Sequence, residues 1–486
     1  MRALNKEILR LAIPSILANI TIPLVGLVDL AIAGHLSAGE AATLIGGISI
    51  GSMLFDLLYW NFGFLRVGTG GMTAQAWGRG DRHEMASLLV RGVGLAFLIA
   101  GVMLLLQWPF VKGVFLFVDC SPQVRELAEQ YFFIRIWAAP ASLALMAFRG
   151  WFIGMQDSVS SMLTDLVVNG VNIVASILLA RAIGFGGIAA GTVTAQYAGL
   201  LFAIGVVLAK YRRSTFVGLG AADFRTAFRG GELRKFMKIN SDLFVRSLSM
   251  VAVYIGFTIL SARYGDLMLA TASILMKLLL LFSYFTDGFA YAGEALTGRF
   301  FGERNRDMVR ETVRWTFVWS MGIGLGFVLV YLFGATPLLR ILTDDRDVIE
   351  ACRLFFIWLL PMPLIGCAAF TWDGVYVGAT ASVPMRDSTV LAAIAFFAFW
   401  LAGISLLDVV KPGLSGVPSP VAGADARQVA AIQILLAAYF AHLAVRTLWL
   451  TIRYRPAVLA KVPRAPGGAV VLDPVTKQEM ETGDVE

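Results

Sequence analysis

The segment from Pro14 to Leu36, PSILANITIPLVGLVDLAIAGHL, decides how the rest of the chain is interpreted. It is apolar and long enough to cross a bilayer, yet it carries one carboxylate, Asp29, in its second half. A charge in hydrocarbon is costly, so such residues usually face a cavity or a partner and mark an ion or substrate route. Pro14 and Pro23 each remove a backbone donor, and we expect this helix to bend. The segment is a candidate proton-operated switch, the alternative being that Asp29 lies solvated at the outer interface.

The composition excludes an ordinary soluble domain. Of the 486 residues, 58% are hydrophobic and 15% are charged, and the mean hydropathy is +0.75, whereas soluble domains are about 25% charged. We therefore expect a polytopic membrane protein. The net charge of +7 should set its orientation in the membrane, and it is no evidence for nucleic acid. The first residues, MRALNKEILRLAIP, contain no small-residue cleavage site, so we expect a retained helix there.

The residues indicate neither a metal site nor an enzyme. Cys120, Cys352 and Cys367 are odd in number and form no CxxC pair, and the three histidines are scattered. A bridge between Cys120 and Cys352 remains an alternative, because both are expected in outer loops. The segment HLSAGE at 35–40 distantly resembles an acyltransferase dyad, but a Walker sequence is absent. We expect no catalytic residues, no metal and no cofactor.

Twelve apolar runs of spanning length are separated by short polar or glycine-rich breaks. They are 8–34, 43–76, 85–108, 126–149, 160–182, 187–209, 236–262, 267–298, 311–334, 350–377, 388–408 and 428–452. The second, eighth and tenth runs are long and rich in glycine, so we expect them to be broken or tilted. Lys and Arg concentrate in the loops that are cytoplasmic if both termini are cytoplasmic, which is the orientation that the positive-inside rule favours.

An internal repeat relates the two halves. The segment LRVGTGGMTAQAWGRGDR aligns with FAYAGEALTGRFFGERNR, which pairs Thr73 with Thr297, and RGWFIGMQDS aligns with DGVYVGATAS, which pairs Gly150 with Gly374. Both alignments share the same offset in residue number. Each half holds an even number of crossings, so the second half enters from the same side and the repeat is parallel.

These observations predict an all-α polytopic membrane protein with 12 transmembrane helices in two six-helix lobes, related by a parallel internal repeat and enclosing a central cavity. The expected boundaries are an N-lobe at 1–209, a basic cytoplasmic linker at 210–235, a C-lobe at 236–453 and a disordered cytoplasmic tail at 454–486.

The apolar runs hold more ionisable groups than a scaffold needs. A spacing of four puts Asp242 and Arg246 on one helix face and predicts a structural ion pair. Asp287 and Glu294, seven residues apart, share a face of their helix, and with Asp373 they are the candidate polar residues of the second lobe. Internal pairing is the alternative for each charge. The other charged residues noted in these runs are Asp56, Arg66, Arg135, Asp165 and Lys277.

One face of the run at 160–182 is also polar. Asp165, Asn169, Asn172 and Ser176 follow one another at helical spacings of four, three and four. The asparagines could hydrogen-bond to Asp29 and bias its affinity for a proton, or they could simply join helices.

Five segments, in order, resemble the multidrug and toxic compound extrusion (MATE) transporters, specifically their DinF branch. They are LVDLAIAGHL around Asp29, the run 139–154 with APASL and GWFIG, INSDLFVRSL from Ile239, DGFAYAGEALTGRFFG from Asp287 and DGVYVGATASVPMRDS from Asp373. The likeness covers about Ile8 to Arg453. It implies two six-helix lobes that alternate between outward-open and inward-open forms and export lipophilic, often cationic compounds in exchange for H⁺ or Na⁺.

The resemblance also implies roles for single residues. Asp29 looks like the first-lobe carboxylate that takes the coupling cation, and Pro14 looks like the hinge of the first helix. Asn172 is similar to the Asn of the family's NxxxD pattern, and Thr192 to a hydroxyl residue on the next helix. The resemblance implies that the protein's partners are small amphipathic molecules and the lipid bilayer. We expect a monomer in the bacterial cytoplasmic (inner) membrane.

One departure from the family's pattern bears on the coupling ion. The acidic position of NxxxD is here Ser176, so a two-carboxylate first-lobe site is in doubt, and Asp373 resembles an acidic group that relatives outside this branch use. With one carboxylate and no cage of oxygen ligands, H⁺ is favoured over Na⁺ as the coupling ion. The alternative function is a flippase or exporter of a lipid-linked or other amphipathic metabolite, whose phosphate the cations Arg66, Arg135 and Lys277 could hold.

Overall fold

The computed structural model describes residues 2–36, 41–116, 120–217, 228, 230–343, 345–411, 413–414, 417–421 and 424–462. The predicted linker falls partly outside these ranges, as does the predicted tail from 463 onward. The last helix continues beyond the predicted end of the C-lobe at 453, since α16 (Ala426–Ala457) is followed by the 3-10 turn η4 (Leu459–Lys461).

The first half contains α1 (Arg2–Leu36), α2 (Ala41–Phe62), α3 (Phe64–Gly78), α4 (Arg82–Val114), α5 (Pro122–Arg135), the 3-10 turn η1 (Ile136–Ala138), α6 (Ala139–Gly154), α7 (Ser158–Ile183), α8 (Gly186–Val206) and the π-helical turn η2 (Val207–Tyr211). The second half contains α10 (Gly231–Ala262), α11 (Asp266–Gly302), α12 (Arg306–Leu342), α13 (Arg346–Phe355), the 3-10 turn η3 (Phe356–Leu359), α14 (Met362–Gly378) and α15 (Ser382–Val410), and it ends with α16 and η4.

Each predicted apolar run coincides with a helix or with a broken helix. The second run breaks at Gly63, between α2 and α3, and the tenth bends by 56° between η3 and α14, where Pro361 and Pro363 lie. The fourth run is interrupted at η1, which was not expected. The eighth run is the uninterrupted helix α11, so of the two alternatives expected there, a break or a tilt, the break is excluded and the tilt stays a prediction. Among the described residues, ten helices are long and apolar enough to cross a membrane, or eleven with the bent pair.

The backbone repeats with the offset seen in the sequence. Gly80 (φ 69°) closes the turn after α3, and its equivalent under this offset, Arg304, has a φ of 57° in the turn after α11. Gln156 (φ 62°) and Thr380 (φ 50°) have the same relationship in the turns after α6 and α14. Left-handed backbone is rare for residues with a side chain. Its recurrence at equivalent positions confirms the predicted repeat.

The two lobes meet where glycines bring their backbones together. A Cβ on Gly78 of α3 would collide with the carbonyl oxygen of Arg299 on α11, and a Cβ on Gly302 would collide with that of Gln75. Gln75 and Arg299 are themselves equivalent under the repeat, as are Gly78 and Gly302, so the repeat exchanges the two contacts. We call this contact of α3 with α11 the seam. A pseudo-two-fold axis runs through it.

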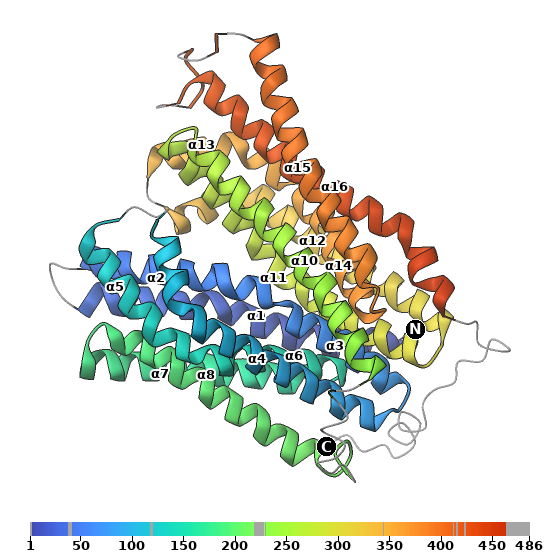
Figure 1. Cartoon of the computed structure of the whole chain (residues 1–486). Coiled ribbons are helices and arrows are strands. Elements are labelled where there is room, and N and C mark those ends of the chain that lie inside the picture. The colour runs from blue at the N-terminus through green and yellow to red at the C-terminus, as the bar shows by residue number, and fades with distance from the viewer. Residues whose placement is uncertain are drawn as a thin grey trace.

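The lobes lie side by side at the seam and diverge toward the ends that carry α5 and α13 (Figure 1). One apolar core fills the N-lobe and continues across the seam into α11 and α14, and a second core fills the C-lobe at its diverging end. Large apolar side chains on the outer surface, such as Leu105 and Phe333, are each 80% exposed. An apolar exterior of this extent is typical of contact with lipid.

Candidate functional site

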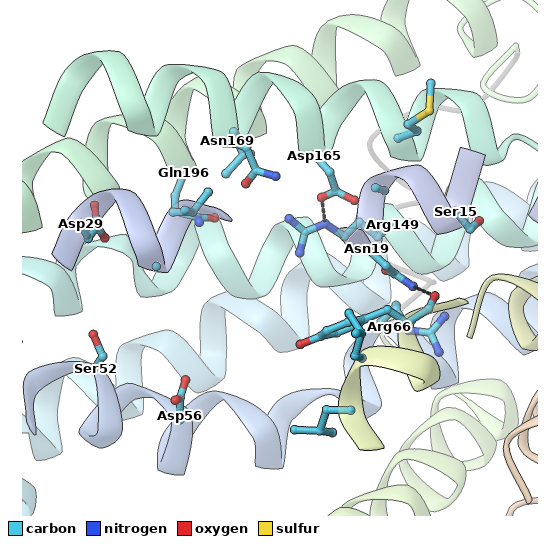
Figure 2. A pocket seen from close by; sticks show the side chains of 18 of the residues that line it. Ser15, Asn19, Asp29, Ser52, Asp56, Arg66, Arg149, Asp165, Asn169 and Gln196 are labelled. Carbon is cyan, nitrogen blue, oxygen red and sulfur yellow. Dashed lines mark hydrogen bonds and ion pairs between the residues drawn. The ribbon is translucent and has the colours of Figure 1, made fainter. Parts of the chain in front are cut away.

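A cavity of about 860 Å³ lies between the lobes, as the sequence predicted. Helix α11 supplies most of its C-lobe wall, and helices α1, α2, α3, α5, α6, α7 and α8 supply the N-lobe wall. Several of its polar residues are shown in Figure 2. The charged residues that line it are Asp29, Asp56, Arg66, Arg135, Arg149, Asp165 and Lys277.

Asp29 lies in the wall that α1 contributes, and only 7% of the residue is exposed. Its Oδ1 atom is buried without a hydrogen-bond partner among the described residues. Its polar neighbours are the hydroxyl of Ser176 on α7 and the positive charge of Arg135 on α5. Burying a carboxylate with an unpaired oxygen is unfavourable. A proton or a cation bound at Asp29 would therefore remove the unfavourable free energy of burying this unpaired oxygen.

The neutral residues predicted beside Asp29 come together. Asn172 of α7 donates through Nδ2 to the hydroxyl oxygen of Thr192 on α8 at 3.0 Å, and its own Oδ1 is buried without a partner among the described residues. Ser176, one turn along α7, donates to the carbonyl oxygen of Ile188 at 3.4 Å. These contacts hold α7 against α8 and leave the amide oxygen of Asn172 available to a proton donor or a cation.

Pro14 lies within α1, which is a continuous helix in this structure. Proline removes one helical hydrogen bond. One residue later, Ser15 donates from its hydroxyl to the carbonyl oxygen of Leu11 at 3.0 Å, a contact that often accompanies helix bending. Asn19 then ties α1 to the other lobe, because its Nδ2 donates to the carbonyl oxygen of Tyr284 on α11 at 3.2 Å. Bending at Pro14 stays a prediction.

Two of the three acidic candidates of the second lobe are held by arginines. Asp373 on α14 accepts hydrogen bonds from Arg246 on α10 at 2.5 Å and from Arg446 on α16. Glu294 on α11 pairs with Arg66 of the other lobe at 3.2 Å. Asp287 forms no ion pair with the described residues, although the charges of these three arginines surround it. Two arginines of the C-lobe therefore pair with the single carboxylate of Asp373.

The predicted ion pair between Asp242 and Arg246 was wrong. Asp242 accepts from Arg386 at 2.7 Å and from the hydroxyl of Ser382 at 2.8 Å, both on α15, whereas Arg246 reaches Asp373. Neighbours four apart on one exposed helix gain only about 0.5 kcal/mol. Charges held between packed helices gain more from partners that lie directly opposite them, because water screens partly buried contacts less.

The sequence interpretation missed three arginines that these carboxylates need. Arg386 and Arg446 belong to the C-lobe pairs, and Arg149 of α6 pairs with Asp165 of α7 at 2.5 Å (Figure 2). Arg446 is fully buried, and its position in the apolar segment AHLAVRTLWL was an available signal, because an unpartnered arginine would not be tolerated there.

Cysteine and metal chemistry have no candidate site in the described ranges. Cys352 and Cys367 are buried, Cys120 is partly exposed, and all three are free thiols, so the alternative of a bridge between Cys120 and Cys352 is wrong. In the same ranges, His, Cys, Asp and Glu side chains form no group of three that could hold a metal ion.

The MatE family model matches this chain twice, at residues 14–178 and at 243–406, once in each lobe. The chain belongs to the MATE family. It is 33% identical over 394 residues to DNA damage-inducible protein F of Escherichia coli K12, a match that covers 81% of this chain and 84% of that protein. It is 21% identical over 419 residues to a probable multidrug resistance protein NorM of Photorhabdus laumondii, covering 82% and 86%.

A solved MATE structure in a bent conformation superposes with a TM-score of 0.77 at 17% identity, covering 95% of this chain and 97% of that one, which supports the fold. The predicted resemblance is thus confirmed, as is the fold of two six-helix lobes around a central cavity. The protein is a multi-pass membrane transporter of small molecules and not an enzyme.

Proposed function

We propose that this MATE transporter exports lipophilic and often cationic compounds by antiport against H⁺, and that Asp29 carries the proton. One observation carries the proposal: Asp29 lines the cavity between the lobes with an oxygen that lacks a partner among the described residues, while Asp373 is bound by two arginines. Relatives named for multidrug resistance support the substrate class.

The proposed cycle begins with substrate in the cavity and Asp29 ionised. Protonation removes the negative charge, which weakens the attraction of Asp29 for a bound cation and for Arg135. Helix α1 then rearranges around Pro14, the substrate leaves, and the proton is released after the lobes have changed their orientation. Coupling requires that proton and substrate bind the two conformations with different affinities, because a ligand without such a difference shifts no equilibrium.

The neighbours of Asp29 favour H⁺ over Na⁺ in this proposal. A metal cation prefers several oxygen ligands arranged around it. The predicted NxxxD position provides the hydroxyl of Ser176 where a second carboxylate would be, and the positive charge of Arg135 lies near Asp29. A positive charge beside the site opposes a metal cation, whereas a proton forms a covalent O–H bond and needs no ligand cage.

We also propose that the protein acts as a monomer in the bacterial cytoplasmic membrane, with both termini inside and the cavity open to the outside. The distribution of Lys and Arg supports this orientation. The cavity is complete within one chain, which supports a monomer.

The test is drug/H⁺ exchange in everted membrane vesicles. Asp29→Asn should lower substrate-induced proton movement about tenfold or more, since the amide cannot take up the proton. Asp56→Asn is the matched control, because Asp56 lines the same cavity on α2, and it should retain exchange at equal expression. Undiminished exchange in Asp29→Asn, or an equal loss in both variants, would rule out the proposed role.

The second candidate is an exporter of anionic amphipathic compounds, such as lipid-linked metabolites. Arg135 and Lys277 line the cavity and form no ion pair with the described residues, so both could bind a phosphate or carboxylate. Arg135 lies over the ring of Phe55 at 4.7 Å and donates to the hydroxyl oxygen of Tyr131 at 3.0 Å, so its contacts there are with neutral groups. Parallel drug-accumulation and lipid-translocation assays in one strain would separate the two functions.

A further inference from the structure

An ion pair beside the cavity joins the two lobes. Arg66 belongs to α3 of the N-lobe, and its Nη1 donates to Oε2 of Glu294 on α11 of the C-lobe at 3.2 Å. The side chain of Glu294 is 1% exposed and that of Arg66 is 19% exposed. Arg66 also lies over the ring of Tyr291 at 4.3 Å. Both Arg66 and Tyr291 line the cavity, so an occupant can contact the same guanidinium that holds Glu294.

The pair occupies the seam without a symmetric copy. Under the offset of the repeat, the position equivalent to Glu294 is Gly70, and the position equivalent to Arg66 is Ala290. A Cβ on Gly70 would overlap Oε1 of Glu294, so the carboxylate occupies the space that the missing side chain leaves. The charge contact between α3 and α11 therefore depends on the two lobes being in register at the seam.

The pair can exist only while the seam is closed. Oε1 of Glu294 is buried without a hydrogen-bond partner among the described residues, which leaves Arg66 as the partner of the other oxygen. Removing one member of a buried pair leaves an uncompensated charge, and this is strongly destabilising. Separation of α3 from α11 must therefore be accompanied by hydration of both groups or by replacement of one partner.

We propose that the Arg66–Glu294 ion pair is a latch between the lobes, and that a substrate releases it by offering Arg66 a second hydrogen-bond acceptor. A carboxylate or phosphate oxygen beside Arg66 in the cavity competes with Glu294 for the guanidinium, because an anionic acceptor binds a guanidinium more strongly than a neutral one does. Compounds that carry such an acceptor beside an apolar body open the seam more readily than compounds without one. The release by substrate rests on the transport function proposed above; the latch itself does not.

The latch is tested with a cysteine reporter at Thr73, which is fully buried on α3 between the ion pair and the closed end of the seam. Thr73→Cys is introduced into a chain whose native cysteines, Cys120, Cys352 and Cys367, are replaced by Ala. The purified protein is placed in lipid nanodiscs, where both faces are accessible, and labelling by a membrane-impermeant maleimide is timed.

Arg66→Gln and Glu294→Gln should each raise the labelling rate about tenfold or more, because each leaves the other charge unpaired. The double variant should label more slowly than the product of the single effects predicts, because it buries no lone charge. Arg66→Lys, which keeps the charge, should lie between wild type and Arg66→Gln. The control is Asp165→Asn, which breaks the Arg149–Asp165 pair within the N-lobe wall of the same cavity. Its labelling should equal that of the wild type.

Unchanged labelling in both single variants, or effects that simply multiply in the double variant, would overturn the latch. Gel filtration identifies a variant that has not folded, and Arg66→Lys then provides the comparison. An equal increase in Asp165→Asn would also overturn it, since general loosening of the cavity would then explain the result.

The release by substrate is tested with two dyes that differ in one group. Tetramethylrhodamine carries a free carboxylate, and its methyl ester does not. At matched occupancy the free acid should raise labelling of the Thr73→Cys reporter at least about twofold over the ester, and Arg66→Gln should abolish this difference. Equal labelling with both dyes would overturn the release. Asp29→Asn should preserve the difference, so failure of the proton antiport and failure of the latch are distinguishable.

Discussion

The two lobes share one fold but differ in how they treat a buried carboxylate. In the N-lobe, Asp29 keeps one oxygen without a partner among the described residues, next to neutral groups and a single positive charge. In the C-lobe, Asp373 is bound by Arg246 and Arg446. A carboxylate between two guanidinium groups is fully paired, whereas a carboxylate with an unpaired oxygen can still bind a further partner. Under the proposed function, Asp29 carries exchange, whereas the two arginines give Asp373 a structural role.

The largest expected effect tests this contrast directly. Asp373→Asn should lower the free energy of unfolding by about 3–5 kcal/mol, because it leaves two arginines without their shared anion. Asp29→Asn should leave stability unchanged or raise it, because an amide loses less than a carboxylate on burial. The measurement is the thermal unfolding midpoint of the purified variants in one detergent. Equal midpoints for the two variants would contradict the assignment of structural and exchange roles.

Glycine substitutions probe what the lobes have in common. A Cβ on Gly150 would collide with the carbonyl oxygen of Arg66, and a Cβ on Gly374 would collide with that of Ala290 at the equivalent contact. Gly150→Ala and Gly374→Ala should therefore each cost about 1–3 kcal/mol, measured by the same thermal unfolding. Gly101→Ala is the control, since nothing lies within 4 Å of its added Cβ, and it should be neutral or stabilising. A loss of stability in only one of the two variants would show that the two glycine contacts are not equivalent.

The smallest effect comes from a contact that only the N-lobe has. Asp157 caps the N-terminus of α7 and accepts hydrogen bonds from Ser160, Lys210 and Tyr211, whereas its equivalent before α15 is Ala381. Burial alone would raise the pKa of the Asp157 carboxyl, but these hydrogen bonds outweigh burial and lower the pKa below its ordinary value.

Because the folded-state pKa is depressed, Asp157 stabilises the protein above the unfolded-state pKa of about 3.9, and this contribution disappears as the pH falls through the folded value. Asp157→Asn should cost about 1–2 kcal/mol at pH 7 and have little effect in acid. Unfolding midpoints of both proteins between about pH 7 and pH 3 check this. A difference that stays constant across this range would contradict the role given to the ionised carboxylate.

The fold was largely predictable because its signals are local. Lipid-facing surfaces require apolar runs of fixed length, and the repeat appeared in matching glycines such as Gly150 and Gly374. The glycines of α11 suggested a possible break in the helix, but their role depends on the helix that packs against them. Gly302 leaves space for the backbone of α3 and does not break its own helix. The position of a glycine is visible in the sequence, but the helix that packs against that glycine is not.

The candidate site was predictable only in part. The sequence interpretation named Asn172 and Thr192, and the structure places them in hydrogen-bond contact. It paired Asp242 with Arg246 because it considered spacing within one helix, while the actual partners lie on α14 and α15. Pairing between distant helices depends on their rotation about their axes. A single sequence does not contain this information.

The seam also shows how a chain with two repeated halves can differ from a symmetric dimer. In a dimer of identical halves, positions 70 and 294 would hold the same residue. Two glutamates would bring like charges and excess volume together, and two glycines would leave the arginine of α3 without its anion. Fusion into one polypeptide removes that constraint, since Gly70 can supply the space that Glu294 fills. An acid–base contact on the axis is thus available to a covalently joined pair of halves and not to their separate ancestor.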